Sequence, residues 1–243
     1  MNSVLESNSK ALAQLQRGDA FGAIKAMKTA VRALRSEAVR ASTNTTTADA
    51  VTTATTMVRQ VAKETTSINR AAFIRPVPIL GNDIDSTTAD NVFVFYCRAF
   101  ELVPTQHQAS EHSRCLVILL YNMGLSWQLA SRLEENPEVA FSLTVHASRS
   151  YRMALDLASS SWSTTEFNEF RCVLLALANN LGEIYYQWRD HKNARDCLEL
   201  ALGILDYPDT SDWIPEDDFD VFYYNLAAFD LNDQGLLALA PAA

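Results

Sequence analysis

The chain has 243 residues, of which 48% are hydrophobic and 20% are charged, the ordinary composition of a folded globular protein. Only 7 glycines and 7 prolines are present, which favours helices over a turn-rich all-β fold. The formal net charge is −9, and an acidic surface repels phosphate backbones, so nucleic acid is not expected as a partner.

The amino-terminal sequence contains no basic stretch followed by an apolar block, so we expect no secretory signal. The longest apolar run, residues 115–121, is much shorter than the roughly 20 residues that cross a bilayer. The four cysteines form no C-x-x-C pair, and Cys115, Cys172 and Cys197 fall within apolar helical patterns, which predicts buried free thiols. We therefore expect a cytoplasmic protein that does not bind membranes.

Residues 1–41 are predicted to form a helix hairpin. Leu5, Leu12 and Leu15 share one apolar face before a break at Gly18, and the apolar residues after the break follow the same period. Residues 42–69 are rich in Thr and Ala and contain few large apolar side chains. Because threonine loses rotamer freedom in helices, this stretch is predicted to be a flexible linker.

Residues 70–104 are predicted to be an extended insertion. Pro76 and Pro78 force extended backbone near its start, and residues 92–96 are all β-branched or aromatic. The two stretches fit a small β-ribbon. Two placements of the ribbon remain open: it packs against the helices, or it occupies a binding groove and blocks partners until it is displaced.

Residues 105–243 are predicted to be helical. Residues 105–108 and 163–166 fit capping boxes, in which a hydroxyl and a side chain three residues later satisfy the first amides of a helix. Asn136 before Pro137 supplies an N-cap and a first-turn proline. These signals mark three helix starts.

Residues 206–220 are acidic, with aromatic side chains between the acids. Such a run can dock a basic partner, or it can be a solvated loop that leads into a helix. The N-terminus of that helix would favour Glu216, Asp217 and Asp218 electrostatically. We expect these carboxylates to be solvated.

Self-similarity is the most informative feature of the sequence. Residues 175–208 span about 34 residues, and within them small, aromatic and large residues stand at fixed spacing, namely Leu181, Gly182, Tyr185, Ala194, Leu198 and Ala201. This spacing resembles the tetratricopeptide repeat, a helix hairpin whose small residues let two helices approach closely. The same types recur in the same order at Leu120, Met123, Gly124, Trp127, Ala147, Tyr151 and Ala154, with a longer hairpin whose tip lies at residues 134–137.

Partial units lie at both ends of the chain. The turn and second helix of a unit are matched by Gly18, Asp19, Ala23, Met27 and Ala30, and a first helix alone is matched by Tyr223, Leu226 and Ala227. The resemblance covers about half of the chain. It implies a mainly α, tetratricopeptide-like solenoid of antiparallel helix hairpins, interrupted by the linker and the β-ribbon. An irregular helical bundle, in which Ala and Leu recur by chance, is the alternative.

The resemblance also implies a concave groove lined by the first helix of each hairpin. Asn122, Asn180 and Asn225 recur at one position of three successive units, and in the family, including its kinesin-light-chain type, that position faces the groove. An asparagine there can offer a donor and an acceptor to the main chain of an extended peptide. The alternative is that these side chains satisfy helix-end or inter-helix groups within the protein.

Further groove positions implied by the same resemblance mix aromatic and polar side chains, and they are Tyr121, Leu125, Asn179, Glu183, Tyr186 and Tyr224. A subtype of the family captures a terminal carboxylate with Lys and Arg. Here the matching positions, which include Asn8 and Leu12, lack those basic residues. The sequence therefore argues against a carboxylate clamp.

No pattern for catalysis is apparent. The four histidines stand in no metal-ligand pattern, and neither a phosphate-binding loop nor a nucleophile elbow occurs. We expect no enzyme, cofactor or metal site, but an adaptor or scaffold that binds a protein or an extended peptide. A structural subunit of a larger helical assembly is the alternative, followed by an enzyme whose site assembles from distant residues. The sequence does not indicate an oligomeric state.

Overall fold

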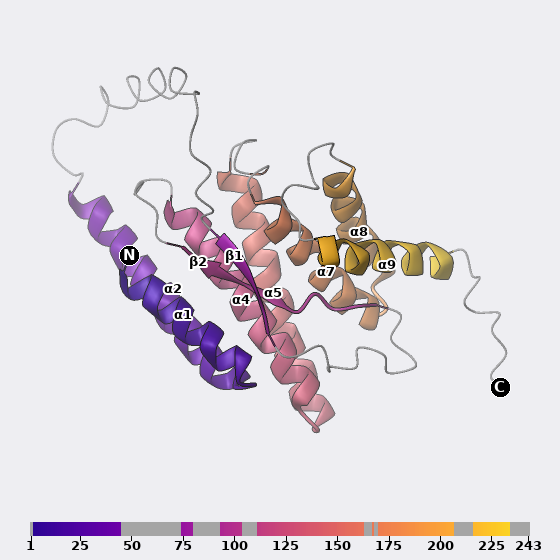
Figure 1. Ribbon diagram of the computed structural model, residues 1–243, viewed down its shortest axis with the longest axis horizontal. Helices are drawn as coiled ribbons and strands as arrows, with labels where there is room; N and C mark the ends of the chain where they lie inside the picture. The colour runs from indigo at the N-terminus through magenta and orange to yellow at the C-terminus, as the bar shows by residue number, and fades with distance from the viewer. Residues whose placement is uncertain are drawn as a thin grey trace, which may run out of the picture.

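The computed structural model describes residues 2–44, 74–79, 93–103, 111–162, 167, 170–206 and 216–233. These residues are mainly helical and include a two-stranded antiparallel sheet (Figure 1). The helices form three successive pairs and a final helix: α1 (Asn2–Gln16) with α2 (Ala20–Asn44), α4 (Glu111–Leu133) with α5 (Pro137–Ser161), α7 (Arg171–Gln187) with α8 (His191–Leu205), and then α9 (Glu216–Asp233). The predicted mainly α class with a small β element is thus confirmed.

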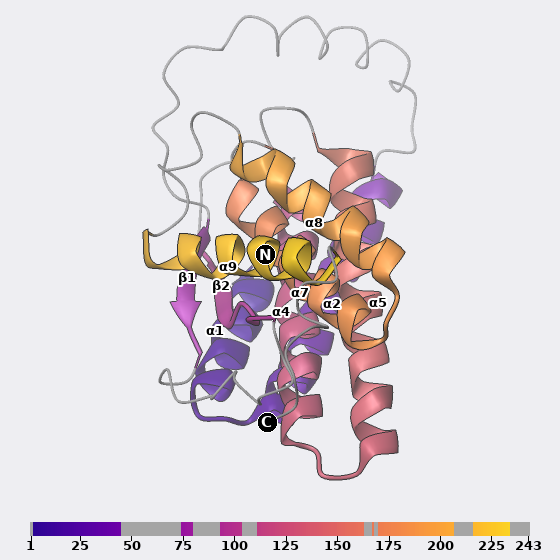
Figure 2. The ribbon, with the colours of Figure 1, turned by 90° about the vertical axis from the view of Figure 1, so that its right-hand side faces the viewer.

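The helix pairs are stacked side by side. Helix α2 contacts α4, α5 contacts α7, and α8 contacts α9, so the second helix of each pair meets the helix that follows it in the chain. Figure 2 shows α9 lying across the end of this stack, where it contacts both α7 and α8. Neighbouring helices stacked in this order are compatible with a helical repeat fold.

Small residues stand where the two helices of a pair come closest. A methyl group added at Gly124 of α4 would lie 2.5 Å from Cε1 of Tyr151 on α5. A methyl group added at Gly182 of α7 would lie 3.3 Å from Cβ of Cys197 on α8. The alanines of the repeat pattern are buried as well: Ala147, Ala154, Ala194 and Ala201. These pairs therefore approach closely because the spacing of small residues leaves room for the facing side chains.

The turns and caps follow from the residues at the helix ends. Gly18 has a φ of +79° in the turn between α1 and α2, a conformation that glycine adopts without strain. The side chain of Asn136 accepts hydrogen bonds from two main-chain N–H groups in the first turn of α5. The predicted cap at Asn136 and the predicted hairpin tip at residues 134–137 are confirmed. The capping boxes at residues 105–108 and 163–166 lie outside the described residues.

The sheet pairs β1 (Ile74–Pro78) with β2 (Arg98–Leu102) in antiparallel register. Pro76 lies opposite Phe100. Proline has no N–H to give to a sheet ladder, so it fits beside a residue whose own polar groups are bonded on the other edge. The predicted β-ribbon is confirmed, and the way Phe100 is bonded explains why a proline-containing strand can pair with it.

The linker and the insertion are described only in part. Helix α2 continues to Asn44, past the predicted end of the hairpin at residue 41. The rest of the Thr-rich stretch 42–69 lies outside the described residues, as do residues 80–92 of the insertion.

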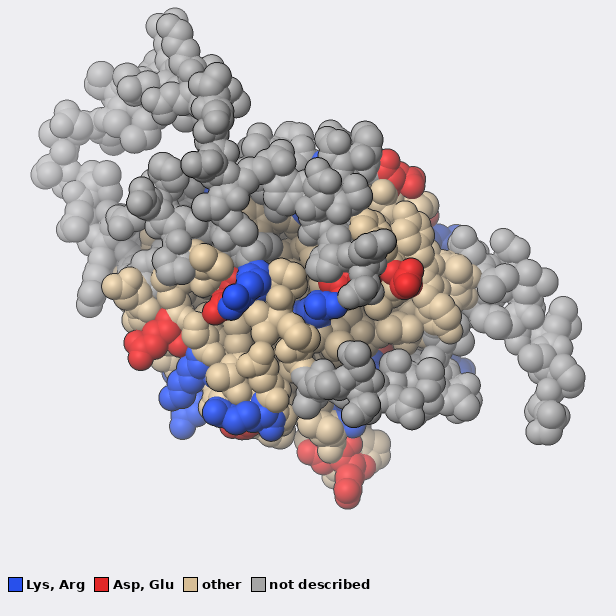
Figure 3. Space-filling view, in the orientation of Figure 1, with Lys and Arg blue, Asp and Glu red and all other residues tan. Residues whose placement is uncertain are grey.

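Two properties of the described residues concern membranes and nucleic acids as partners: the apolar character of the helices and the distribution of surface charge. No helix in the described ranges combines the length and the apolar character needed to cross a bilayer. On the face drawn in Figure 3, basic and acidic side chains are interspersed, and the described part of this face carries no continuous basic surface.

Candidate functional site

An extended segment of the chain itself lies against α1, α4, α7 and α9. We call residues 93–102 the internal segment; its second half is strand β2. Figure 1 shows it running from β2 beside α4 towards α7 and α9. Side chains of all four helices bond to its main chain. The segment therefore crosses the position that the sequence predicts to be a peptide-binding groove.

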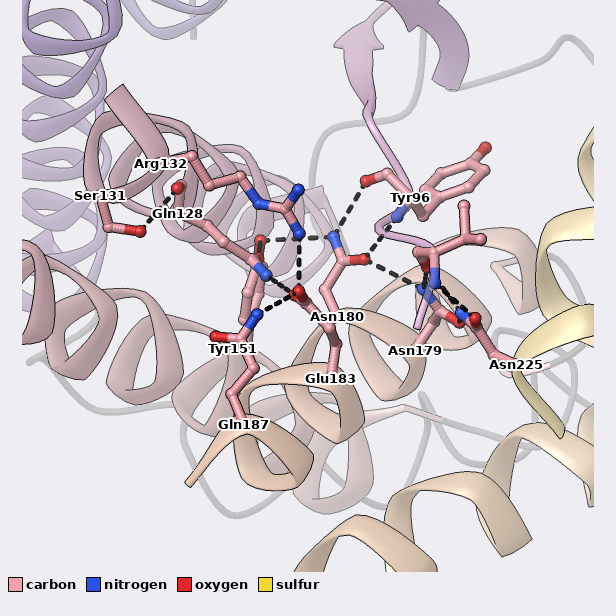
Figure 4. A network of polar contacts seen from close by, with 11 residues as sticks. Tyr96, Gln128, Ser131, Arg132, Tyr151, Asn179, Asn180, Glu183, Gln187 and Asn225 are labelled. Carbon is pink, nitrogen blue, oxygen red and sulfur yellow. Dashed lines mark hydrogen bonds and ion pairs between the residues drawn. The ribbon is translucent and has the colours of Figure 1, made fainter. Parts of the chain in front are cut away.

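Asn180 of α7 bonds to both main-chain polar groups of Tyr96. Its Oδ1 accepts from the Tyr96 N–H at 3.0 Å, and its Nδ2 donates to the Tyr96 carbonyl at 3.0 Å (Figure 4). In an extended strand the N–H and C=O of one residue point to the same edge, so a single carboxamide can bond both. Asn180 thus replaces a neighbouring strand at this position.

Asn122 and Asn225 repeat this arrangement. Asn122 of α4 accepts from the Phe100 N–H at 2.9 Å and donates to its carbonyl at 2.7 Å. Asn225 of α9 accepts from the Val94 N–H and donates to its carbonyl, each at 2.6 Å. We call Asn122, Asn180 and Asn225 the asparagine ladder. All three side chains are fully buried.

The ladder binds one edge of the internal segment. Residues 94, 96 and 100 are separated by even numbers, so their polar groups project to the same side. Residue 98 completes this series, because the Tyr121 hydroxyl donates to the Arg98 carbonyl at 2.9 Å. The opposite edge of residues 98–102 is free to pair with β1. This division is why the strand containing Pro76 can form the other side of the ribbon.

Two further asparagines support the ladder from either end. Asn179 donates to the Val94 carbonyl at 3.2 Å and accepts from Asn225 Nδ2 at 2.6 Å. Asn8 of α1 accepts from Asn122 Nδ2 at 3.1 Å, and its own Nδ2 lies 3.4 Å from the Phe100 carbonyl. These contacts hold the carboxamides in the orientation that the internal segment requires.

A buried polar cluster lies beneath the ladder. Glu183 accepts hydrogen bonds from Gln128 and Gln187 and forms an ion pair with Arg132 at 2.6 Å (Figure 4). Burial raises the pKa of the Glu183 carboxyl, while the Arg132 charge acts in the opposite direction. The cluster reaches the ladder through Tyr151, whose hydroxyl donates to Gln128 at 2.8 Å.

Tyr151 joins this cluster to the ladder. Asn180 Nδ2 lies 3.4 Å from the Tyr151 hydroxyl. Burial holds the pKa values of Tyr151 and Tyr121 well above their usual range, so both hydroxyls stay protonated and can donate. A chain of hydrogen bonds therefore runs from the Glu183 carboxylate to the main chain of Tyr96.

The aromatic side chains of the internal segment are buried in the protein interior. Phe93 packs on Tyr186, with ring centroids 4.8 Å apart, and Phe100 packs on Tyr121, with centroids 5.0 Å apart. The guanidinium of Arg132 lies 4.5 Å from the centroid of the Phe95 ring. These contacts add apolar burial to the main-chain bonds.

Asp218 binds two side chains of the internal segment. Its Oδ2 accepts from the Tyr96 hydroxyl at 2.9 Å, and its Oδ1 lies 2.5 Å from Nε of Arg98. Asp218 is only 3% exposed, so the expectation that the acids at the start of this helix are all solvated is wrong for it. The physical reason is the arginine that approaches from the internal segment and supplies the opposite charge.

The structure brings most of the predicted groove residues to one place. Asn122, Asn180, Asn225, Tyr121 and Asn179 all bond to the internal segment, and Tyr186 packs against it. The remaining buried members are Glu183, in the polar cluster, and Leu125, in the hydrophobic core. Tyr224 differs from them, since it is 52% exposed on α9.

The sequence does not predict four residues as members of the site: Gln128, Arg132, Gln187 and Asp218. Asn8 is matched there to a groove position but not to the ladder. For Asn8 a signal exists in the sequence, because Asn8 lies eleven residues before the turn residue Asp19, as Asn179 lies eleven residues before Asp190. Gln128 and Asp218 belong to no repeat pattern. Their roles depend on contacts between distant parts of the chain.

The predicted buried thiols are confirmed. Cys115, Cys172 and Cys197 are buried and form no disulfide bond, whereas Cys97, within the internal segment, is half-buried. Burial raises the pKa of Cys172 and of Cys197 to about 12. In the part of the chain that the structure describes, no group of three or more His, Cys, Asp or Glu side chains is placed to hold a metal ion.

Comparison with known proteins adds no family to this geometry: no protein-family model, no curated protein and no solved structure matches the chain.

Proposed function

We propose that this chain is a non-enzymatic protein-interaction module, an adaptor or scaffold, whose tetratricopeptide-like solenoid holds an extended peptide of a partner protein. One observation supports it above the others. Asn122, Asn180 and Asn225, on three separate helices, each bond both the N–H and the C=O of one residue in an extended segment. This is the geometry with which a groove binds a peptide main chain.

Main-chain binding of this kind is transferable between peptides. The ladder contacts atoms that every extended peptide carries, so the occupant need not be the internal segment. Each hydrogen bond contributes about 0.5–1.5 kcal/mol net, and a buried amide left without a partner costs about 1–3 kcal/mol. A partner segment that supplies the same three main-chain positions would therefore satisfy the ladder as well as residues 94, 96 and 100 do.

The internal segment acts as a competitor for the partner. It belongs to the same chain as the groove, so its binding is intramolecular, and the effective concentration of a linked segment can reach the millimolar range. A partner peptide must overcome this advantage through better contacts, through its own local concentration, or through loosening of the segment. The proposal thus selects, of the two placements left open by the sequence, the one in which the insertion occupies the groove and blocks partners.

A structural role is the second candidate. It is favoured by the complete burial of the ladder beneath the chain's own segment, since a filled groove needs no partner. In that case the ladder fastens the ribbon to the helices, and the chain serves as a rigid subunit of a larger helical assembly.

A peptide-binding experiment separates the two candidates. Val94→Pro removes the N–H group that donates a hydrogen bond to Asn225, and Val94→Ala is the matched control that keeps this N–H group. The probe is a fluorescent synthetic peptide with the sequence of residues 92–103 and serine in place of Cys97. We expect the Val94→Pro chain to bind this probe more tightly than the Val94→Ala chain.

A second probe tests the main-chain contacts directly. N-methylation of the peptide at the position of Tyr96 removes the donor that Asn180 accepts, and we expect it to abolish binding. If neither chain binds the unmodified probe, although circular dichroism shows both to be folded, the groove is not open to partners and the structural role stands.

A further inference from the structure

We infer that the groove selects partner segments that carry a tyrosine two residues before an arginine, and that Asp218 makes this selection. The inference rests on the proposed function and extends it from the main chain of the bound peptide to its side chains. It is drawn from the way the internal segment is held.

One carboxylate binds two side chains of the internal segment. The Tyr96 hydroxyl donates to Asp218 Oδ2 at 2.9 Å, and Arg98 Nε lies 2.5 Å from Asp218 Oδ1. In an extended strand, side chains two residues apart lie on the same face, about 7 Å apart at their origins. A single carboxylate between them can therefore use one oxygen for each, and a spacing of two residues places both groups within its reach.

Burial makes this pair of contacts selective. Asp218 is 3% exposed, whereas the side chain of Arg98 is 27% exposed. A buried carboxylate that loses a partner keeps its desolvation cost without the compensating bond, so an occupant lacking the hydroxyl or the guanidinium is disfavoured. Asp218 would thus reject most extended peptides that the asparagine ladder alone would accept.

The tyrosine side chain is enclosed by two helices. Its ring centroid lies 5.0 Å from that of Phe222 on α9, and its hydroxyl lies 3.8 Å from Sγ of Cys172 on α7. A phenylalanine would fill the same space, but it would leave Asp218 without the hydroxyl donor. The site therefore distinguishes tyrosine from phenylalanine by a hydrogen bond and not by size.

The main-chain contacts fix the register in which these side chains are read. Asn180 bonds both polar groups of Tyr96, and the Tyr121 hydroxyl bonds the Arg98 carbonyl at 2.9 Å. The two residues whose side chains Asp218 binds are thus also held by their main chains. A partner with the same residues at another spacing cannot satisfy both the ladder and Asp218.

A peptide series tests the inference in the Val94→Pro chain, in which the internal segment is bound less tightly to the groove because it lacks the hydrogen bond to Asn225. The reference is the synthetic peptide of residues 92–103 with serine in place of Cys97. Three variants of it carry Tyr96→Phe, Arg98→Gln, or an N-methyl group at the position of Tyr96. We expect the first two to bind about tenfold more weakly than the reference, and the third not to bind.

A substitution in the protein tests whether Asp218 is the residue that recognises the arginine of the peptide. Asp218→Asn in the same background removes the charge that Arg98 faces, and we expect the preference for arginine over glutamine in the peptide to disappear. Asp220→Asn is the matched control, because Asp220 is exposed on the same helix, and it should leave the preference unchanged.

The outcomes separate the inference from the proposed function. If the reference, the Tyr96→Phe and the Arg98→Gln peptides bind equally well while N-methylation abolishes binding, the groove reads the main chain alone, and the role of Asp218 is wrong. If no peptide binds, the proposed function fails together with the inference. Since the peptide series requires no change at Asp218, the inference remains testable even if Asp218→Asn does not fold.

Discussion

The ring of Tyr151 lies against Gly124, so closely that a methyl group at residue 124 would fall 2.5 Å from its Cε1 atom. The same tyrosine carries the hydroxyl that bonds Gln128 and lies 3.4 Å from Asn180 Nδ2. The absence of a side chain at residue 124 therefore sets both the distance between α4 and α5 and the position of a hydroxyl beneath the asparagine ladder.

We expect Gly124→Ala to lower the free energy of unfolding by about 1–3 kcal/mol, because the added methyl group overpacks the contact with Tyr151. Urea denaturation measures the change. The matched control is Gly203→Ala on α8, where the added methyl group meets no described atom within 4 Å. There the higher helix propensity of alanine should raise stability by up to about 1 kcal/mol. An equal effect of both substitutions would contradict the packing role of Gly124.

Asn180→Ala should lower the free energy of unfolding by about 1–3 kcal/mol, because it leaves the N–H and C=O of Tyr96 without their partner. Asn193→Ala is the control, since Asn193 is exposed on α8, and the loss of its bond to the exposed N-cap residue Asp190 should cost only about 0.5 kcal/mol. The two variants are compared by chemical denaturation, and a similar loss in both would show that the ladder contributes nothing specific.

The amides of Val94, Tyr96 and Phe100 should exchange with solvent slowly, because each donates to a buried asparagine. Hydrogen exchange measured by NMR gives their protection residue by residue. In Asn180→Ala the protection of Tyr96 should fall more than that of Phe100, which Asn122 still holds. Uniform exchange along the internal segment in the unaltered chain would contradict the ladder.

Stability should fall as the pH rises above about 9, because burial raises the pKa values of Cys172 and Cys197 from 9.0 to about 12. The unfolded chain releases these protons first, so the contribution is complete below pH 9 and is lost between about pH 9 and 12. Each thiol should contribute a loss of about 1 kcal/mol between pH 8 and pH 10.

The double variant Cys172→Ala with Cys197→Ala tests that pH dependence. The difference between the denaturant midpoints at pH 8 and pH 10 should be smaller in this variant than in the unaltered chain. An unchanged difference would assign the alkaline loss to other groups, of which the buried tyrosines are the first to consider, since burial raises the pKa of Tyr96 well above its usual range.

Local packing signals in the sequence predict much of the fold. Gly124 and Gly182 each mark a close helix pair, because the missing side chain makes room for a residue of the facing helix. The spacing of small residues in the sequence is enough to identify both positions. Asn136 marks the start of α5, since capping is a contact over three residues. The ribbon follows from Pro76 and the β-branched residues of the insertion, which restrict their own backbone. Signals of this kind lie within one helix or one hairpin, so they can be recognised without knowledge of the whole tertiary structure.

The occupant of the ladder is of a different kind. The position of Asn122, Asn180 and Asn225 can be read from their recurrence, but nothing in that recurrence names what they bind. Asn180 and Tyr96 are 84 residues apart, and Asn225 and Val94 are 131 apart. The role of Asp218 cannot be predicted from the sequence for the same reason, because its burial is stabilised by Arg98, which lies far away in the sequence. Contacts of this length depend on how the helices are stacked.

The order in which the chain is synthesised gives these long separations a consequence for folding. The internal segment leaves the ribosome before α4, α7 and α9, and Asn225 follows Val94 by 131 residues. At about 5–20 residues per second, the last rung of the ladder is made about 7–26 s after the residue it binds. During that interval the aromatic, β-prone segment does not yet have all of its buried partners. A nascent chain therefore passes through a stage in which the segment is available to chaperones or to other strands, and only the completion of α9 closes it off.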